Sequence, residues 1–130
     1  STPAEEKSAE LDAAATDIII AGHCGIPFTQ QIANRIWFNP GVIGMPANDG
    51  TPDGWYGLIE CDAGRGGLNF QLRRLGYDAR AAAEALNRSG HSEAYAKALL
   101  TGLWPSLDVL PEAERHATGQ RIPENEATLT

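Results

Sequence analysis

The stretch AGHCGIPF, residues 21–28, places His23 and Cys24 next to each other between two glycines. A histidine beside a cysteine could form a nucleophile with its base, supply two metal ligands, or contribute half of a disulfide. The preceding residues follow a helical pattern, so Cys24 is expected at a helix C-terminus, where the helix dipole disfavours a thiolate. This argues against catalysis by the pair and favours the interpretation that it marks the end of the first helix, with Cys24 facing inward toward the region of Cys61.

Cys61, in IECDAG, is the only other cysteine. A Cys24–Cys61 disulfide would suit an oxidising compartment, whereas two buried free thiols are typical of a cytoplasmic protein. Together with His23, Glu60 and Asp62, the cysteines include ligand types that zinc accepts, yet their spacing lacks the paired pattern of zinc sites. The sequence leaves the disulfide open, favours free thiols, and predicts neither a metal nor another cofactor.

The segment CDAGRGGLN, residues 61–69, could expose backbone N–H groups to an anion, because its glycines precede an expected helix. Arg65 lies in this segment, and Arg73 and Arg74 follow in the next element. The pattern matches neither a phosphate loop nor a dinucleotide fingerprint. The three arginines are therefore candidates for binding an anion or the acidic surface of a partner, although a solvated turn accounts for the same residues.

Aromatic side chains flank a long segment rich in Gly, Pro, Asn and Asp, at about residues 39–57. Long irregular segments in compact domains are usually functional or mobile. Aromatic residues at loop edges anchor a loop to the core, and when exposed they carry much of the energy of an interface. The candidate partner-binding residues are Trp37, Phe38, Met45, Trp55 and Tyr56.

Helical spacing and capping residues predict helix over most of the chain. The first helix is expected from Thr2 to about Ala21, and later helices are expected to begin near Thr29, Leu68, Asp78, Ser92 and Pro111. Only WYGLIECD, residues 55–62, is typical of a strand. We expect a mainly α fold, a compact bundle of about five or six short helices with one long irregular loop (about 39–57) and at most one or two short strands. Residues 1–118 would form a single helical domain, followed by a loose tail at 119–130.

The composition is that of a folded domain, with 42% hydrophobic and 21% charged residues in a chain of 130. A net charge of −7 disfavours a protein that binds nucleic acid through its phosphates. No run approaches the roughly 18 apolar residues that a membrane span needs. The opening residues from Ser1 do not resemble a signal peptide. We expect a soluble, acidic, cytoplasmic protein, and secretion stays open because a leader could have been removed.

Two functions are compatible with these patterns. The favoured one is a binding or assembly protein, an accessory or structural subunit that engages a protein partner or another copy of itself through residues 39–60. It is favoured because the predicted strand has no partner strand and no catalytic set stands out. The alternative is a small enzyme, or a protein that binds a ligand or metal, with a pocket near His23, Cys24, Glu60, Cys61 and Asp62.

Overall fold

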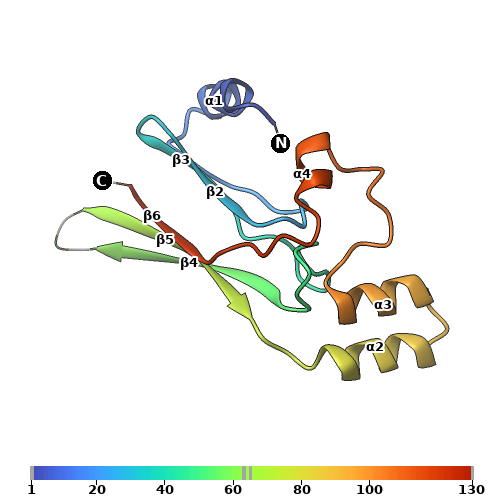
Figure 1. The fold of residues 1–130 in the computed structure, drawn as a ribbon. Coiled ribbons are helices and arrows are strands. Elements are labelled where there is room, and N and C mark those ends of the chain that lie inside the picture. Colours follow the sequence, from blue (N-terminus) through green and yellow to red (C-terminus); the bar gives the residue numbers. More distant parts are fainter. Residues whose placement is uncertain (1, 63, 65, 130) are drawn as a thin grey trace.

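A computed structural model gives the fold and describes residues 2–62, 64 and 66–129. The described part contains four helices and six strands in two sheets, so the expectation of a mainly helical bundle with one or two strands is wrong. In chain order the elements are α1 (Ala4–Ala13), β1 (Ile18–Ile20), β2 (Phe28–Ile32), β3 (Arg35–Asn39), β4 (Gly54–Asp62), β5 (Gly67–Leu75), α2 (Ala79–Arg88), α3 (Glu93–Thr101), α4 (Glu112–His116) and β6 (Asn125–Leu129). Figure 1 shows the sheets stacked beneath α1, with α2 and α3 paired to one side.

The first sheet has the strand order β1-β3-β2. β2 and β3 form an antiparallel hairpin where a helix was expected to begin at Thr29. Ile36 and Phe38 alternate with less buried neighbours along β3, which is the two-residue period of a strand. β1 pairs in parallel with β3, and its three isoleucines prefer extended backbone because they are β-branched. The first helix therefore ends at Ala13, well before the expected Ala21.

The second sheet is antiparallel, in the order β4-β5-β6. The strand predicted at residues 55–62 is confirmed as β4. The helix predicted from Leu68 is wrong, because Phe70 and Leu72 are buried at alternate positions of β5. The tail expected to be loose supplies β6, in which Ala127 pairs with Phe70. Hydrogen bonding to a central strand thus orders part of 119–130.

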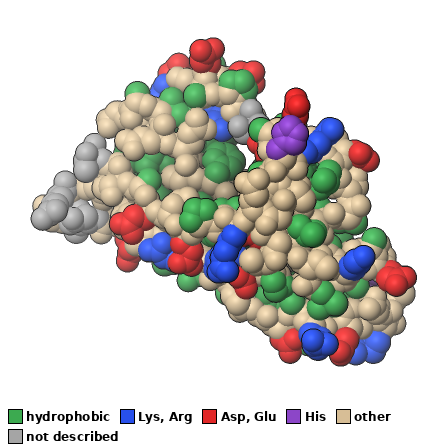
Figure 2. All heavy atoms as spheres, in the orientation of Figure 1, with side chains coloured by type: hydrophobic (Ala, Val, Ile, Leu, Met, Phe, Trp, Pro, Cys, Tyr) green, Lys and Arg blue, Asp and Glu red, His purple; other side chains and the backbone are tan. Residues whose placement is uncertain are grey.

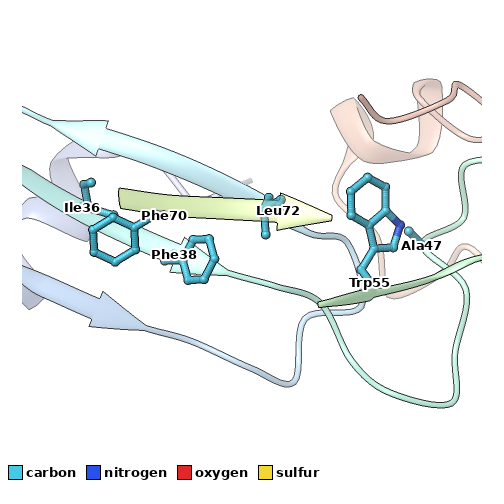
Figure 3. Close-up of a cluster of buried hydrophobic side chains, with 6 residues drawn as sticks. All are labelled: Ile36, Phe38, Ala47, Trp55, Phe70 and Leu72. Atoms are coloured by element: carbon cyan, nitrogen blue, oxygen red, sulfur yellow. The ribbon is translucent and has the colours of Figure 1, made fainter. Parts of the chain in front are cut away.

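The main core lies between the two sheets. The rings of Phe38 on β3 and Phe70 on β5 meet edge to face, with centroids 5.4 Å apart (Figure 3). Gly57 on β4 makes room for this contact, because a Cβ atom at that position would lie 2.5 Å from the Phe38 ring. The sheet faces are thus held together by aromatic packing that depends on a missing side chain in β4.

α1 covers the outer face of the first sheet. Leu11 is fully buried beneath it, and Arg35 on β3 donates to Asp12 Oδ1 (2.5 Å) and to Ser8 Oγ (2.6 Å). Figure 2 shows acidic side chains gathered over α1 and hydrophobic side chains in a recess below it. The result is a three-layer arrangement of α1, the first sheet and the second sheet.

The helices predicted after Asp78, Ser92 and Pro111 are confirmed as α2, α3 and α4. Asp78 Oδ1 accepts from the Ala81 N–H at 2.9 Å, and Ser92 Oγ accepts from the Tyr95 N–H, as N-caps do. α2 and α3 pack on each other through a small cluster of their own, which contains Ala83, Ala96 and Leu99. Within the described ranges, no helix is long and apolar enough to cross a membrane.

The long irregular segment is shorter than expected and its centre is buried. Between β3 and β4 it spans residues 40–53, and the four residues 46–49 are inside the protein. Asn48 accepts from the Trp104 N–H at 2.9 Å and donates to Thr118 Oγ1 at 3.0 Å. The Gly50 N–H donates to the Gly102 carbonyl. The segment is therefore tied to the C-terminal part of the chain, and its centre is not the outward surface that the sequence indicated.

Candidate functional site

A hollow of about 470 Å³ lies beside the turn that carries His23 and Cys24. It is lined by the start of α1, the turn after β1, the ends of β2 and β3, and the chain between Trp104 and α4. Both His23 and Cys24 are exposed and follow a strand, so the expectation that they end a helix is wrong. The helix-dipole argument against Cys24 therefore does not apply. His23 adopts a left-handed conformation, with φ of 68°.

Asn39, at the end of β3, holds this turn in place and lines the hollow. Its Nδ2 donates to the carbonyls of Cys24 (3.0 Å) and Ile26 (2.8 Å). The two acceptors fix the orientation of the side-chain amide, because only the nitrogen can donate. Asn39 is fully buried, and its Oδ1 has no hydrogen-bond partner among the described residues. An unmet buried acceptor is uncommon and calls for an explanation.

The rest of the hollow is largely apolar. Trp37 and Phe28 come from the first sheet, and Trp104 lies so close to the turn that a Cβ atom on Gly25 would be 2.7 Å from its ring. Lys7 enters from α1, where its ammonium lies 4.5 Å from the centroid of the Phe28 ring. The hollow has the size and the mixture of aromatic walls and few polar groups that small-molecule sites have.

The other ionisable residues proposed near His23 lie elsewhere. Glu60 and Cys61 are on β4, in the second sheet, and Glu60 Oε2 accepts from Gln71 Nε2 at 2.8 Å. Asp62 is the last residue of β4. No group of three or more His, Cys, Asp or Glu residues capable of holding a metal ion exists in the described ranges. The structure thus divides the predicted cluster between the two sheets.

Both cysteines are free and exposed. The Cys24 thiol contacts the carbonyl of Ile26 at 3.8 Å, and Cys61 lies near the far end of β4. The structure therefore contains no Cys24–Cys61 bond, and the interpretation of these residues as buried thiols, with Cys24 facing inward, is wrong.

The three arginines have different environments. Arg65 lies outside the described residues. Arg73 is paired with Glu126 of β6 at 3.6 Å, on the outer face of the second sheet. Arg74 contacts the carboxylates of Asp49 (2.6 Å) and Asp53 (3.2 Å). The two carboxylates occupy the Arg74 guanidinium, which leaves it poorly suited to binding an external anion.

Asp49 is held by several groups at once. Its side chain accepts from the backbone and side chain of Thr51, from Arg74, and from the Ile122 N–H. Burial by itself raises the pKa of the Asp49 carboxyl, and the hydrogen bonds from Thr51, Arg74 and Ile122 outweigh it, so the pKa lies below the ordinary 3.8. This cluster joins residues 49–53 to β5 and to the chain before β6.

The five aromatic and Met candidates for partner binding fall into three groups by burial. Phe38 and Trp55 belong to the core, where Trp55 also stacks on the Arg74 guanidinium at 4.5 Å. Trp37 is half-buried and lines the hollow, and Met45 is half-buried. Tyr56 on β4 is exposed. A partner could therefore reach Tyr56 directly, whereas contact with Phe38 or Trp55 would require the core to open.

Two exposed apolar residues of β4 extend the surface around Tyr56. Leu58 lies on the same face of the strand as Tyr56, and Ile59 lies on the face toward the first sheet. Neither residue was among the predicted site residues, and neither was Asn39. The consecutive apolar pair Leu58–Ile59, which puts one apolar side chain on each face of the strand, was the available signal, while nothing in the sequence distinguishes Asn39.

Comparison of the chain with protein families, curated proteins and solved structures finds no match.

Proposed function

We propose that this chain is an assembly subunit that pairs with a second copy of itself along the open edge of β4. The observation that carries the proposal is the position of β4 at the end of the order β4-β5-β6, with nine residues and one neighbouring strand. An edge strand presents unpaired N–H and C=O groups to another chain. The β4 edge overlaps the C-terminal part of the predicted partner-binding region 39–60 and excludes the buried residues 46–49.

β4 lacks the features that commonly protect an edge strand. Its sequence GWYGLIECD contains no Lys, Arg or Pro, and the acids Glu60 and Asp62 lie together at one end. Tyr56, Leu58 and Ile59 are each about two fifths exposed. A long and mostly uncharged edge with exposed apolar side chains is expected to find a partner.

The charges of β4 favour an antiparallel pair with a second copy. Full overlap of two strands that span 54–62 places Leu58 opposite its own copy at the twofold axis. Glu60 then faces Tyr56 of the second copy, and Asp62 faces Gly54. A parallel pair would instead bring like acids side by side. The antiparallel register therefore separates the four carboxylates and makes one continuous six-stranded sheet.

The neighbouring edge of the first sheet supports the same arrangement. β2 packs near β5 and β6, so β1, at the opposite edge of its sheet, lies on the β4 side. Ile20 of β1 is 61% exposed there. Pairing along β4 would place Ile20 and Ile59 close to the second copy and would shield both from water.

Sedimentation of the purified chain tests the proposal. We expect a concentration-dependent dimer, and we expect Leu58→Lys to be a monomer, because two ammonium groups would face each other at the axis. Leu100→Lys is the matched control: Leu100 on α3 is 49% exposed, against 42% for Leu58, and lies outside β4. A wild-type chain that stays monomeric at high micromolar concentration, or an unchanged dimer in Leu58→Lys, would rule out the pairing.

The register has its own test. Tyr56→Lys places an ammonium opposite Glu60 of the second copy, so at low salt its dimer should be tighter than that of the double variant Tyr56→Lys/Glu60→Gln. The interaction of such a cross-strand pair is about 0.2–1 kcal/mol. Equal dimer affinities in these two variants would exclude the antiparallel register centred on Leu58.

Two further expectations belong to this proposal. We expect no nucleic-acid partner, since the net charge is −7 and Arg73 and Arg74 are engaged with carboxylates.

We also infer a reducing compartment such as the cytoplasm, because two exposed, unbonded thiols are typical of proteins kept reduced. Oxidised chains recovered with intermolecular disulfides from the native source would contradict the second expectation.

A further inference from the structure

We propose that the hollow beside His23 and Cys24 binds a small planar aromatic molecule carrying an N–H or O–H group, whose hydrogen bond is accepted by Asn39 Oδ1. This site is separate from the β4 edge: it is formed by the first sheet, α1 and the chain from Trp104 to α4. The inference rests on the shape and lining of the hollow and on the unmet acceptor in its wall.

The lining selects for a flat, mostly apolar ligand. Trp37, Phe28 and Trp104 bring three aromatic rings to the hollow, and Val109 and Leu110 add aliphatic surface. A volume of about 470 Å³ lies within the range of small-molecule sites. Aromatic side chains favour aromatic guests through offset stacking and edge contacts in addition to burial of apolar area.

Asn39 supplies the polar selectivity. Its Nδ2 is used by the carbonyls of Cys24 and Ile26, so only Oδ1 is left to interact, and Oδ1 can only accept. A buried acceptor without a partner costs free energy that a ligand N–H or O–H would recover. A ligand of the same shape without a donor would leave that cost in place.

The turn of residues 22–25 controls access to this acceptor. Oδ1 is shielded from solvent, and the turn that Asn39 holds is its immediate neighbour. His23 and Cys24 are exposed on the turn, and His23 already has a left-handed backbone that non-glycine residues seldom adopt. The ligand's donor reaches Oδ1 through a small shift of this turn that keeps the Asn39 Nδ2 hydrogen bonds, and the bound ligand then covers the side of Cys24 that lines the hollow.

Cys24 and Cys61 make the experiment internally controlled. Indole serves as the probe, because it is planar and aromatic with a single N–H, and benzofuran serves as the matched probe of similar shape without a donor. The rate of alkylation by iodoacetamide is followed at each cysteine by mass spectrometry while either probe is titrated. We expect indole to slow alkylation of Cys24 severalfold and to leave Cys61, on β4, unchanged.

The comparison of the two probes tests the hydrogen bond. Benzofuran should require about fivefold more probe for the same protection, the factor expected for one net hydrogen bond. Equal potency of the two probes, no protection of Cys24 up to the solubility of indole, or equal slowing at Cys61 would each overturn the proposal.

A pair of glycine variants tests the location without disturbing Asn39. A Cβ atom at Gly22, which lines the hollow, meets no atom within 4 Å, and the same holds at Gly76, outside it. Gly22→Leu should weaken protection by indole severalfold because its side chain narrows the hollow, and Gly76→Leu should leave it as in the wild type. Unchanged protection in Gly22→Leu would place the probe elsewhere and overturn the proposal.

Discussion

Arg74 and Asp49 form a buried ion pair, with Nη2 of the guanidinium 2.6 Å from Oδ2 of the carboxylate. The pair joins the end of β5 to the segment between β3 and β4. The same guanidinium lies over the ring of Trp55 and donates to the Ile122 carbonyl at 2.6 Å. A single arginine side chain thus connects the β4 end of the buried segment to the chain that leads into β6.

Arg74→Ala should therefore destabilise the protein by about 3–5 kcal/mol, because it leaves the Asp49 carboxylate buried without its cation. Its neighbour Arg73 is the control. Arg73→Ala removes a partly exposed pair with Glu126 and two long hydrogen bonds to the carbonyls of Leu72 (3.4 Å) and Asn125 (3.5 Å), and should cost at most about 1 kcal/mol. Urea unfolding of the two variants measures both values. Similar losses in the two variants would show that the Arg74 cluster has no special role.

The lowered pKa of Asp49 predicts a loss of stability in acid. A carboxyl whose pKa is lower in the folded than in the unfolded chain stabilises the fold above the unfolded value, and this contribution is lost as pH falls through the folded value. The ordinary value is 3.8, so the loss should begin near pH 4 and continue below it. The difference in free energy of unfolding between wild type and Asp49→Asn, which cannot titrate there, should shrink over that range. If the difference in free energy of unfolding stayed constant from about pH 6 down to about pH 2.5, the lowered pKa of Asp49 would be contradicted.

Gly57→Ala should destabilise the core by about 1–3 kcal/mol, because the added methyl group overlaps the Phe38 ring and must displace it. Gly76→Ala is the matched control, since its methyl group meets no atom within 4 Å and stiffens only the unfolded chain. Thermal unfolding followed by near-ultraviolet circular dichroism reports both stability and aromatic packing. A Gly57→Ala protein with unchanged stability would mean that the two sheets do not meet as closely as described.

Both thiols should react in the folded protein. Titration of dilute native protein with a thiol reagent should give two thiols per chain, because Cys24 and Cys61 are exposed. Cys24→Ser and Cys61→Ser should each leave one reactive thiol. If native protein purified without reductant contained no reactive thiol, and reductant restored two per chain, Cys24 and Cys61 would be held in disulfide bonds, contrary to the structure.

Local signals in the sequence were enough for the helices of the second half. Asp78 and Ser92 cap α2 and α3 through hydrogen bonds to residues only three positions away. Such interactions depend on neighbouring residues alone, so the sequence states them directly. β4 was predictable for a similar reason, because Trp55, Tyr56, Leu58 and Ile59 lie within one short run of strand formers.

The first half was misassigned because short apolar patterns fit helix and strand equally well. Ile32 and Ile36 are four residues apart, which suits one face of a helix, yet Ile36 and Phe38 also alternate as in a strand. On β5, Leu68, Phe70 and Leu72 alternate with polar residues as in a strand, although a helix was predicted there. Pairing with distant strands decides between the two, and a window of ten residues does not contain that information.

Short-range patterns in the chain were enough to predict the capped helices α2 and α3, the strand β4 and the acidic net charge. Contacts between residues far apart in the chain could be read only from the folded protein. It buried Asp49 against Arg74, assigned His23 and Cys24 to a strand-end turn beside a hollow, and left the edge of β4 open. Caps and turns act over three or four positions, whereas the contacts of Asp49 with Arg74 and with Ile122 join residues 25 and 73 positions apart and therefore depend on the whole fold.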